Sequence, residues 1–272
     1  MRLIGFSRNK LDSTEDLKAI WSSIVSIFGE NDFWFDVECD GRREDRVPFD
    51  VKRGAKELYE TGVVGFFREN VVGVGIDNQG HKDPRWIYPH SMVSVETMGT
   101  DSADSLRGTD WFLLCEHLVG AMQLELAIVL GTKERMAGYN TPLGIGIGLP
   151  QVFWIMSFGR DYTKLLLPRG NQPTMFFKRT ENPHTGCAAL MSAPTYNEYL
   201  SIPIELFRAQ RNEIGDRLFH RMPAEKQSAG GAEVSWIFSP KNIFGFASSI
   251  YREKMTNWRK YQAELVPSYY KA

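Results

Sequence analysis

Hydrophobic residues near the amino terminus recur every three or four positions. Between residues 13 and 29 this spacing predicts an amphipathic helix, whose buried side consists of Leu17, Ile20, Trp21, Ile24, Ile27 and Phe28. Ser13 and Asp16 stand three residues apart just before this run, as in a capping box, and Gly29 follows it as a stop signal. The first long helix therefore has a start, an apolar face and an end that can all be read from the chain.

The next segment, DFWFDVECDG, changes to a period of two. Such alternation is typical of a strand with one buried and one exposed face. The buried side is expected to carry Phe33, Phe35, Val37 and Cys39, and the exposed side Asp32, Trp34, Asp36, Glu38 and Asp40. We call these five exposed residues the acidic strand face.

The rest of the chain alternates between the two periods and predicts an α+β fold, with mixed or antiparallel sheets and packed helices. Strands are expected at 2–7, 63–70, 71–77, 91–98, 126–131, 151–159, 174–180 and 186–192, with a turn at Glu69–Asn70. Helices are expected at 55–60, 110–125 and 161–167, from Pro203 onward, and in a C-terminal helical segment, 234–272. We expect residues 1–272 to form a single globular unit with two related sub-halves, 1–85 and 86–222.

Composition supports a packed protein that is not a general nucleic-acid binder. Hydrophobic residues make up 43% and charged residues 24% of the chain, which is enough for a core. The net charge of −1 lacks the basic excess that binding to phosphates requires. Cys39, Cys115 and Cys187 are odd in number and far apart, which favours reduced thiols. No secretory signal and no apolar run of spanning length is evident, so we expect a cytoplasmic protein.

The motifs that carry chemistry are weak. Asp36, Asp50 and Lys52 resemble the carboxylate and lysine set of metal-dependent nucleases, and a metal-dependent hydrolase or nuclease is the alternative function. The pattern is short, and its surroundings read as a loop. The run from Gly144 to Gly148 precedes a predicted strand, whereas a phosphate-binding loop opens a helix. The sequence therefore predicts no enzyme, no bound metal and no cofactor.

The acidic strand face has two interpretations. Arg42, Arg43 and Arg46 follow it and could neutralise a solvated face by local ion pairs. Alternatively, its carboxylates steer and orient a basic partner protein, and Trp34 is the anchor of that interface. Carboxylates alone could also hold a metal, but no further ligands are evident.

The segment QVFWIMSFGRDYTKLL, residues 151–166, has a Trp-containing strand that runs into Gly159 and a helix with Tyr162 and Leu165. It resembles the immunity protein 52 family, to which the TsiT-type immunity proteins of type VI secretion and polymorphic toxin systems belong. The opening from Leu17 to Cys39 is compatible with that family. The resemblance implies a non-enzymatic antitoxin that binds a cognate bacterial toxin and occludes its active site. The implied toxin is a restriction-endonuclease-like nuclease with a basic cleft, acting in the cytoplasm.

Overall fold

A computed structural model of the chain describes residues 1–7, 9–36, 47–78, 81, 91–98, 107–124, 126–131, 152–160, 163, 174–214, 219–221 and 235–237. Its strands are β1 (Arg2–Ser7), β2 (Phe33–Phe35), β3 (Val63–Arg68), β4 (Val72–Asp77), β5 (Ser91–Thr97), β6 (Leu126–Leu130), β7 (Ile155–Phe158), β8 (Lys178–Glu181), β9 (Ala188–Met191), β10 (Phe219–Arg221) and β11 (Ser235–Ile237). Its helices are α1 (Thr14–Phe28), α2 (Val51–Thr61), α4 (Gly108–Met122), α7 (Tyr196–Leu200) and α8 (Ile204–Ile214).

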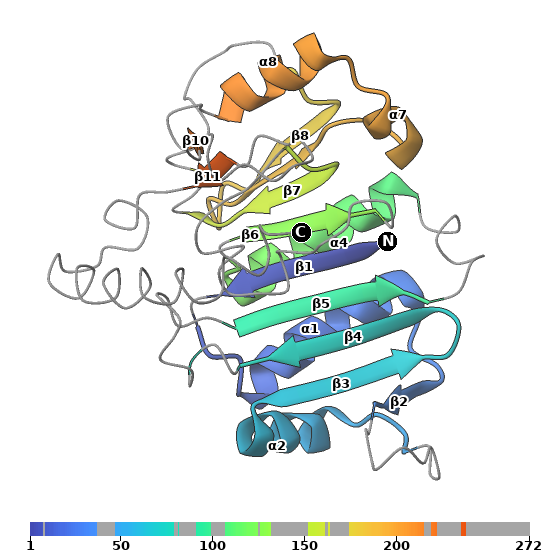
Figure 1. Ribbon diagram of the computed structural model, residues 1–272. Coiled ribbons are helices and arrows are strands. Elements are labelled where there is room, and N and C mark those ends of the chain that lie inside the picture. The colour runs from blue at the N-terminus through green and yellow to red at the C-terminus, as the bar shows by residue number, and fades with distance from the viewer. Residues whose placement is uncertain are drawn as a thin grey trace, which may run out of the picture.

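Nine of the described strands form one antiparallel sheet in the order β2-β3-β4-β5-β1-β6-β7-β9-β8 (Figure 1). The first strand, β1, lies in the middle between β5 and β6. Strands from both predicted sub-halves therefore belong to the same sheet. Strands β10 and β11 pair separately. Helices together with a large antiparallel sheet confirm the predicted α+β class.

Helices α1 and α4 lie behind the sheet as drawn in Figure 1, and α2 contacts α1. We call the side of the sheet that they cover the helix face. The predicted capping box of α1 is present, because the Ser13 hydroxyl accepts the Asp16 N–H at 3.0 Å and Asp16 accepts the Ser13 N–H at 3.2 Å. Gly29 ends the helix with φ 80°. The predicted apolar side of α1 belongs to the same core cluster as side chains of β1 to β5 and of α4.

The opposite side of the sheet is covered over only part of its width. On β1, β6, β7 and β9 it carries apolar residues that form a second cluster, which Phe207 and Ile214 of α8 join. The strand residues of that cluster are Ile4, Phe6, Leu126, Ile128, Met156, Phe158, Ala188 and Leu190. These strands are thus buried on both sides, which explains why their sequences read as continuous apolar runs rather than as alternating ones.

Several predicted boundaries are wrong. Residue Asp32 is not in a strand, because its φ of 64° places it in a turn before β2, which spans only Phe33–Phe35. Helix α2 begins at Val51 rather than at residue 55. Residues 235–237 form β11, within the segment expected to be helical. The short helix α7 was not predicted; Thr195 caps it and accepts the Glu198 N–H at 3.2 Å.

The turn predicted at Glu69–Asn70 is present, and Asn70 has the left-handed φ of 57° that such turns use. The Gly144–Gly148 run, the arginines after the acidic strand face and most of the predicted 161–167 helix lie outside the described residues. Among the helices that the structure describes, none has the length and apolar character needed to cross a membrane.

Candidate protein-binding face

Strand β2 directs Trp34 away from the core. Phe33 and Phe35 are 5% and 4% exposed and pack into the helix-face core, where Phe33 meets Trp21 edge to face at 4.9 Å between ring centroids. Because side chains alternate along a strand, Trp34 lies on the opposite side of the sheet. It is partly exposed there and stands beside Phe67 of β3.

The five residues of the acidic strand face fall in three places. Trp34 and Asp36 share one side of the sheet, and the backbone N–H of Asp36 donates to the carbonyl of Gly65 at 2.9 Å. Asp32 is exposed in the turn that precedes β2. Glu38 and Asp40 lie outside the described residues. The structure thus places Trp34 and Asp36 on one side of the sheet and Asp32 in the turn before β2.

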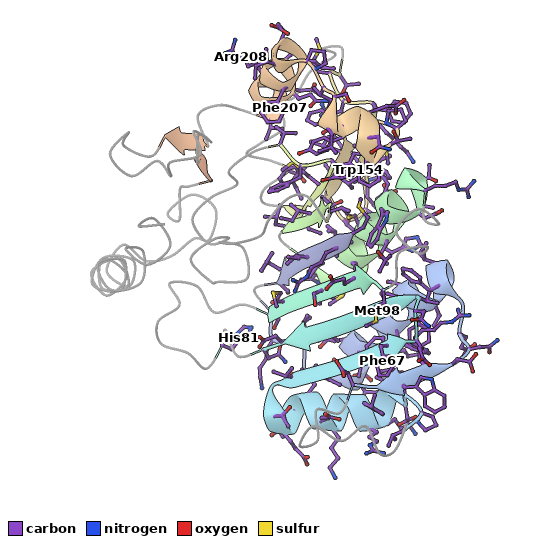
Figure 2. The ribbon with its side chains drawn as sticks, turned by 45° about the vertical axis from the view of Figure 1, so that its right-hand side comes forward. Phe67, His81, Met98, Trp154, Phe207 and Arg208 are labelled. Atoms are coloured by element: carbon purple, nitrogen blue, oxygen red, sulfur yellow. The ribbon has the colours of Figure 1, made fainter. Side chains whose placement is uncertain are left out.

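Around Trp34 and Asp36 the structure shows a wider surface, which the sequence reasoning did not find. Cross-strand neighbours form one row from Trp34 through Phe67 and Gly73 to Glu96, and a second row from Asp36 through Gly65 and Gly75 to Ser94. We call this surface the open face; it consists of Trp34, Asp36, Gly65, Phe67, Gly73, Gly75, Ser94, Glu96 and Met98. Figure 2 shows Phe67 and Met98 near each other at one end of these strands.

Glycines form the floor of the open face, and neighbouring side chains lie over them. A Cβ atom at Gly65 would stand 3.0 Å from the Cβ of Asp36, and one at Gly75 would stand 3.0 Å from the Oγ of Ser94. At Gly73 it would stand 3.4 Å from the sulfur of Met98. The glycines therefore allow Asp36, Ser94 and Met98 to lie flat on the sheet.

The same glycines explain why the cover of this side stops at the middle of the sheet. In the second row, the positions on β1 and β6 are Ile4 and Ile128, which are buried in the cluster that α8 joins. In the same row, the positions on β3 and β4 are Gly65 and Gly75, which have no side chain that must be removed from water. In the part of the chain that the structure describes, no helix lies over the open face.

The charged groups of the open face are mainly acidic. Asp36 and Glu96 are exposed, and Asp77 lies on the same side of β4. Arg2 is the cross-strand neighbour of Glu96. Arg68 belongs to the helix face, where its guanidinium donates to the carbonyl of Phe28. Three carboxylates, those of Asp36, Asp77 and Glu96, thus lie on this side of β2 to β5 or directly after β2, against one neighbouring cation, Arg2, among the described residues. The apolar side chains of the open face are Trp34, Phe67 and Met98.

The alternative nuclease set has a structural role in part. The Asp50 carboxylate caps α2 and accepts the backbone N–H of Arg53 at 2.8 Å. Lys52 is exposed in the first turn of that helix. Among the residues placed by the structure, no three His, Cys, Asp or Glu side chains are grouped so as to hold a metal. The sequence signal at Asp50 is therefore explained by N-capping.

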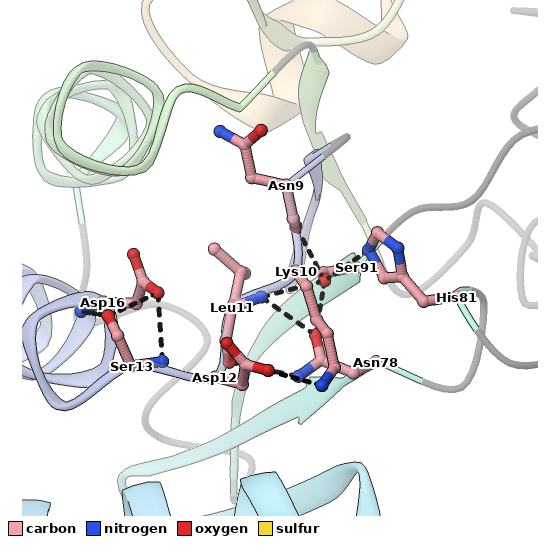
Figure 3. A network of polar contacts seen from close by, with 9 residues as sticks. All are labelled: Asn9, Lys10, Leu11, Asp12, Ser13, Asp16, Asn78, His81 and Ser91. Carbon is pink, nitrogen blue, oxygen red and sulfur yellow. Dashed lines mark hydrogen bonds and ion pairs between the residues drawn. The ribbon is translucent and has the colours of Figure 1, made fainter.

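A buried polar network connects the chain after β1 to the ends of β4 and β5 (Figure 3). Asn78 accepts the Leu11 N–H at 3.2 Å and donates to the Leu11 carbonyl at 3.1 Å. The Ser91 hydroxyl is bonded to Asn78 and, at 2.9 Å, to the carbonyl of Asn9. His81 Nε2 lies 3.2 Å from the Ser91 oxygen.

This network resembles a hydroxyl–imidazole pair, but its geometry is that of a structural tie. Ser91 is fully buried, and its single proton is directed to carbonyl oxygens. The bonding is complete when His81 Nε2 carries a hydrogen and donates it to Ser91. Burial is the main cause that lowers the pKa of His81; Lys10 adds to it, whereas the hydrogen bond to the Asn9 backbone and Asp12 oppose it.

The residues behind the family resemblance are part of the core where they are described. Trp154, labelled in Figure 2, is 2% exposed. It donates its indole N–H to the carbonyl of Ala193 at 2.8 Å and packs against Tyr196. Tyr162 and Leu165 lie outside the described residues. Cys115 and Cys187 are free thiols, and burial raises the pKa of Cys115 well above its usual range. Cys39 lies outside the described residues.

A scan against protein-family models finds no match for the chain, and a search of curated proteins finds none either. The resemblance to the immunity protein 52 family therefore stays a prediction.

Proposed function

We propose that this chain is an immunity protein, which binds a cognate bacterial toxin through the open face and blocks the toxin's active site. The observation that carries the proposal is the composition of that face. Trp34 and Phe67 are cross-strand neighbours that are partly exposed, Met98 lies over the adjacent Gly73, the exposed Asp36 and Glu96 lie on the same side, and glycines form the floor. This composition supports recognition of a partner protein.

The apolar side chains of the open face are suited to form the centre of an interface. Binding energy concentrates in a few aromatic and apolar residues that become fully dry in the complex. Trp34 and Phe67 are direct cross-strand neighbours, and Met98 reaches over the adjacent strand. Methionine adapts its shape to the partner, because its side chain is unbranched. Asp36, Ser94 and Met98 lie flat over the glycines, so the face offers a partner a low surface that carries both apolar and acidic groups.

The acidic groups determine which partner fits. Asp36 and Glu96 are exposed at the two sides of the face and would attract a basic surface. A nuclease has such a surface, because its cleft must hold the phosphates of a nucleic acid. The resemblance to the immunity protein 52 family implies the same partner class. Within this proposal, the toxin acts in the cytoplasm and the antitoxin is located there as well.

The proposal is tested with the protein encoded by the neighbouring reading frame. Both proteins are coexpressed, the complex is purified, and its affinity and association rate are measured at two salt concentrations. Changing Asp36 and Glu96 together to Lys should slow association at least tenfold at low salt and less at high salt. Changing Trp34 to Ala should weaken binding by about 2 kcal/mol or more, mainly through faster dissociation.

The matched control is Glu205→Lys, because Glu205 is exposed at the start of α8, outside the open face. This variant should bind like the unmodified chain. If the Asp36, Glu96 and Trp34 variants all bind with unchanged affinity, the open face is not the interface. If the neighbouring protein neither binds the chain nor harms cells in its absence, the immunity function itself is refuted. Assays of the isolated chain for nuclease activity with Mg²⁺ or Mn²⁺ test the hydrolase alternative.

A further inference from the structure

Strand β8 forms one end of the nine-stranded sheet. It pairs with β9, and within the described part of the chain no strand pairs with its other side. At the opposite end of the sheet, residues 47–49 cover the edge of β2: Phe35 donates to the carbonyl of Val47 and Phe49 donates to that of Phe33. An uncovered edge strand is a template for pairing with another strand.

The hydrogen bonds show which backbone groups of β8 point outward. Asn182, directly after the strand, donates its N–H to the carbonyl of Cys187 on the β9 side at 2.8 Å. Successive residues of an antiparallel strand direct their N–H and C=O groups to opposite edges. Thr180 therefore points its backbone groups toward β9, and Arg179 and Glu181 point theirs toward the free edge.

Helices support both sides of β8 and hold it in place. On the helix face, Lys178 stacks over the ring of Phe112 of α4 at 4.3 Å, and the Thr180 hydroxyl bonds to Glu116 of the same helix. On the other side, Arg179 forms an ion pair with Glu213 of α8 at 3.0 Å. The edge is thus ordered in advance, which lowers the entropy lost when another strand binds.

We propose that β8 pairs antiparallel with β8 of a second copy, around a twofold axis that passes through Thr180. In this register Arg179 lies opposite Glu181 of the second copy, and Glu181 opposite its Arg179. Each of these pairs exchanges two backbone hydrogen bonds, because both residues direct their N–H and C=O groups outward. The sheet then continues from one copy into the other as an isologous dimer.

Charge selects this register over its nearest alternative. If the twofold axis passed through Arg179, this residue would lie opposite Arg179 of the second copy. Like charges directly opposite each other are destabilising. With the axis at Thr180, opposite charges face each other twice, and Arg179 also keeps its neighbours Glu181 and Glu213. Phe177, which is 57% exposed directly before the strand, would come beside Pro183 of the second copy. An exposed aromatic side chain at this place then has an apolar neighbour.

The test uses the full chain alone, in sedimentation equilibrium at concentrations up to roughly 100 µM, since a short edge contact gives a weak dimer. We expect a concentration-dependent shift from the mass of one chain to the mass of two. Glu181→Pro removes an outward N–H without removing a bond to β9, so it should abolish the dimer while the fold is retained. Glu181→Arg should weaken the dimer about tenfold or more, because Arg179 would face a like charge. The control Glu60→Arg makes the same charge change on α2 and should leave the dimer unchanged.

A crosslinking experiment tests the register itself. In the proposed dimer Thr180 lies opposite Thr180 of the second copy, and these two residues share no backbone hydrogen bonds. The Cβ atoms of such a pair lie about 4.5–5.5 Å apart, which is close enough for a disulfide after slight adjustment. Thr180→Cys should therefore form a covalent dimer rapidly with a mild copper oxidant, and Lys178→Cys, on the same side of the strand but opposite Asn182, should not. A chain that remains monomeric throughout the concentration range refutes the proposal. So does a dimer that survives Glu181→Pro, or equal crosslinking of the two cysteine variants.

Discussion

Replacing Asn78 with Ala is expected to destabilise the fold strongly, although only one small polar side chain is changed. Asn78 is fully buried at the end of β4. Its amide makes a reciprocal pair of hydrogen bonds with the N–H and the carbonyl of Leu11 and a further bond with Ser91. Asn78 thus gives the backbone of the chain after β1 the hydrogen-bond partners that a neighbouring strand would provide.

The magnitude follows from what each group retains in the variant. The Leu11 N–H still has the Ser91 oxygen at 3.3 Å, and the Ser91 hydroxyl still has the Asn9 carbonyl at 2.9 Å. The Leu11 carbonyl loses the one side-chain donor described for it. A buried group left without a partner costs about 1–3 kcal/mol, and each other lost bond about 1 kcal/mol. The free energy of unfolding should therefore fall by roughly 2–4 kcal/mol.

The assay is urea denaturation followed by tryptophan fluorescence, with the midpoint and the slope fitted separately. Ser91→Ala should cost less than Asn78→Ala, and the double variant less than the sum, because the two side chains share one bond. Asn197→Ala is the matched control; this residue is exposed on α7, and its loss should cost no more than about 0.5 kcal/mol. If Asn78→Ala costs as little as the control, the network of Figure 3 does not hold this part of the molecule together.

Three further outcomes are expected. His81 has a lowered pKa in the folded state, so its contribution to the free energy of unfolding is complete above about pH 6.5 and is lost as pH falls below that value. His81→Gln should therefore make the free energy of unfolding less dependent on pH between about pH 6.5 and pH 5. An unchanged pH dependence would contradict this. Trp154→Phe should cost about 1–3 kcal/mol in urea denaturation, because the buried Ala193 carbonyl loses its indole donor; a cost near zero would show that this bond is not important. A Cβ at Gly131 would stand 1.8 Å from the Tyr196 ring, so Gly131→Ala should lower the melting temperature and Tyr196→Ala should partly restore it; absence of rescue would show that the clash is not the cause.

Helices and strands could be predicted from the sequence where one side of the element is polar and the other apolar. Helix α1 was predicted with its capping box, its apolar side and its final glycine, and the structure confirms all three. Strands β3 and β4 and the turn at Asn70 were also predicted correctly. Helix α2 was predicted too short, because its first turn, from Val51 to Gly54, looks like a loop when the cap at Asp50 is not recognised.

The candidate site was only partly predictable. The alternation around Trp34 correctly indicated that Phe33 and Phe35 are buried and that Trp34 faces the other way. Phe67, Glu96 and Met98 were missed, because cross-strand register is a property of pairing between distant segments. A signal for the glycine floor was nevertheless present. In VGVGID, glycines alternate with valine and isoleucine, which places all glycines on one side of the strand.

The sequence by itself determined the α+β class, the core helix that follows β1 and the direction in which Trp34 points. Each of these follows from local periodicity, which requires no knowledge of distant residues. Only the tertiary structure decided the strand order, with β1 between β5 and β6, and the union of β2 to β5 into one open face. It also decided that β8 lies at an edge of the sheet, with the backbone N–H and C=O groups of Arg179 and Glu181 directed toward the free edge. The physical reason is that strand neighbours are chosen by burial and hydrogen bonding across the whole chain, and these terms have no local pattern.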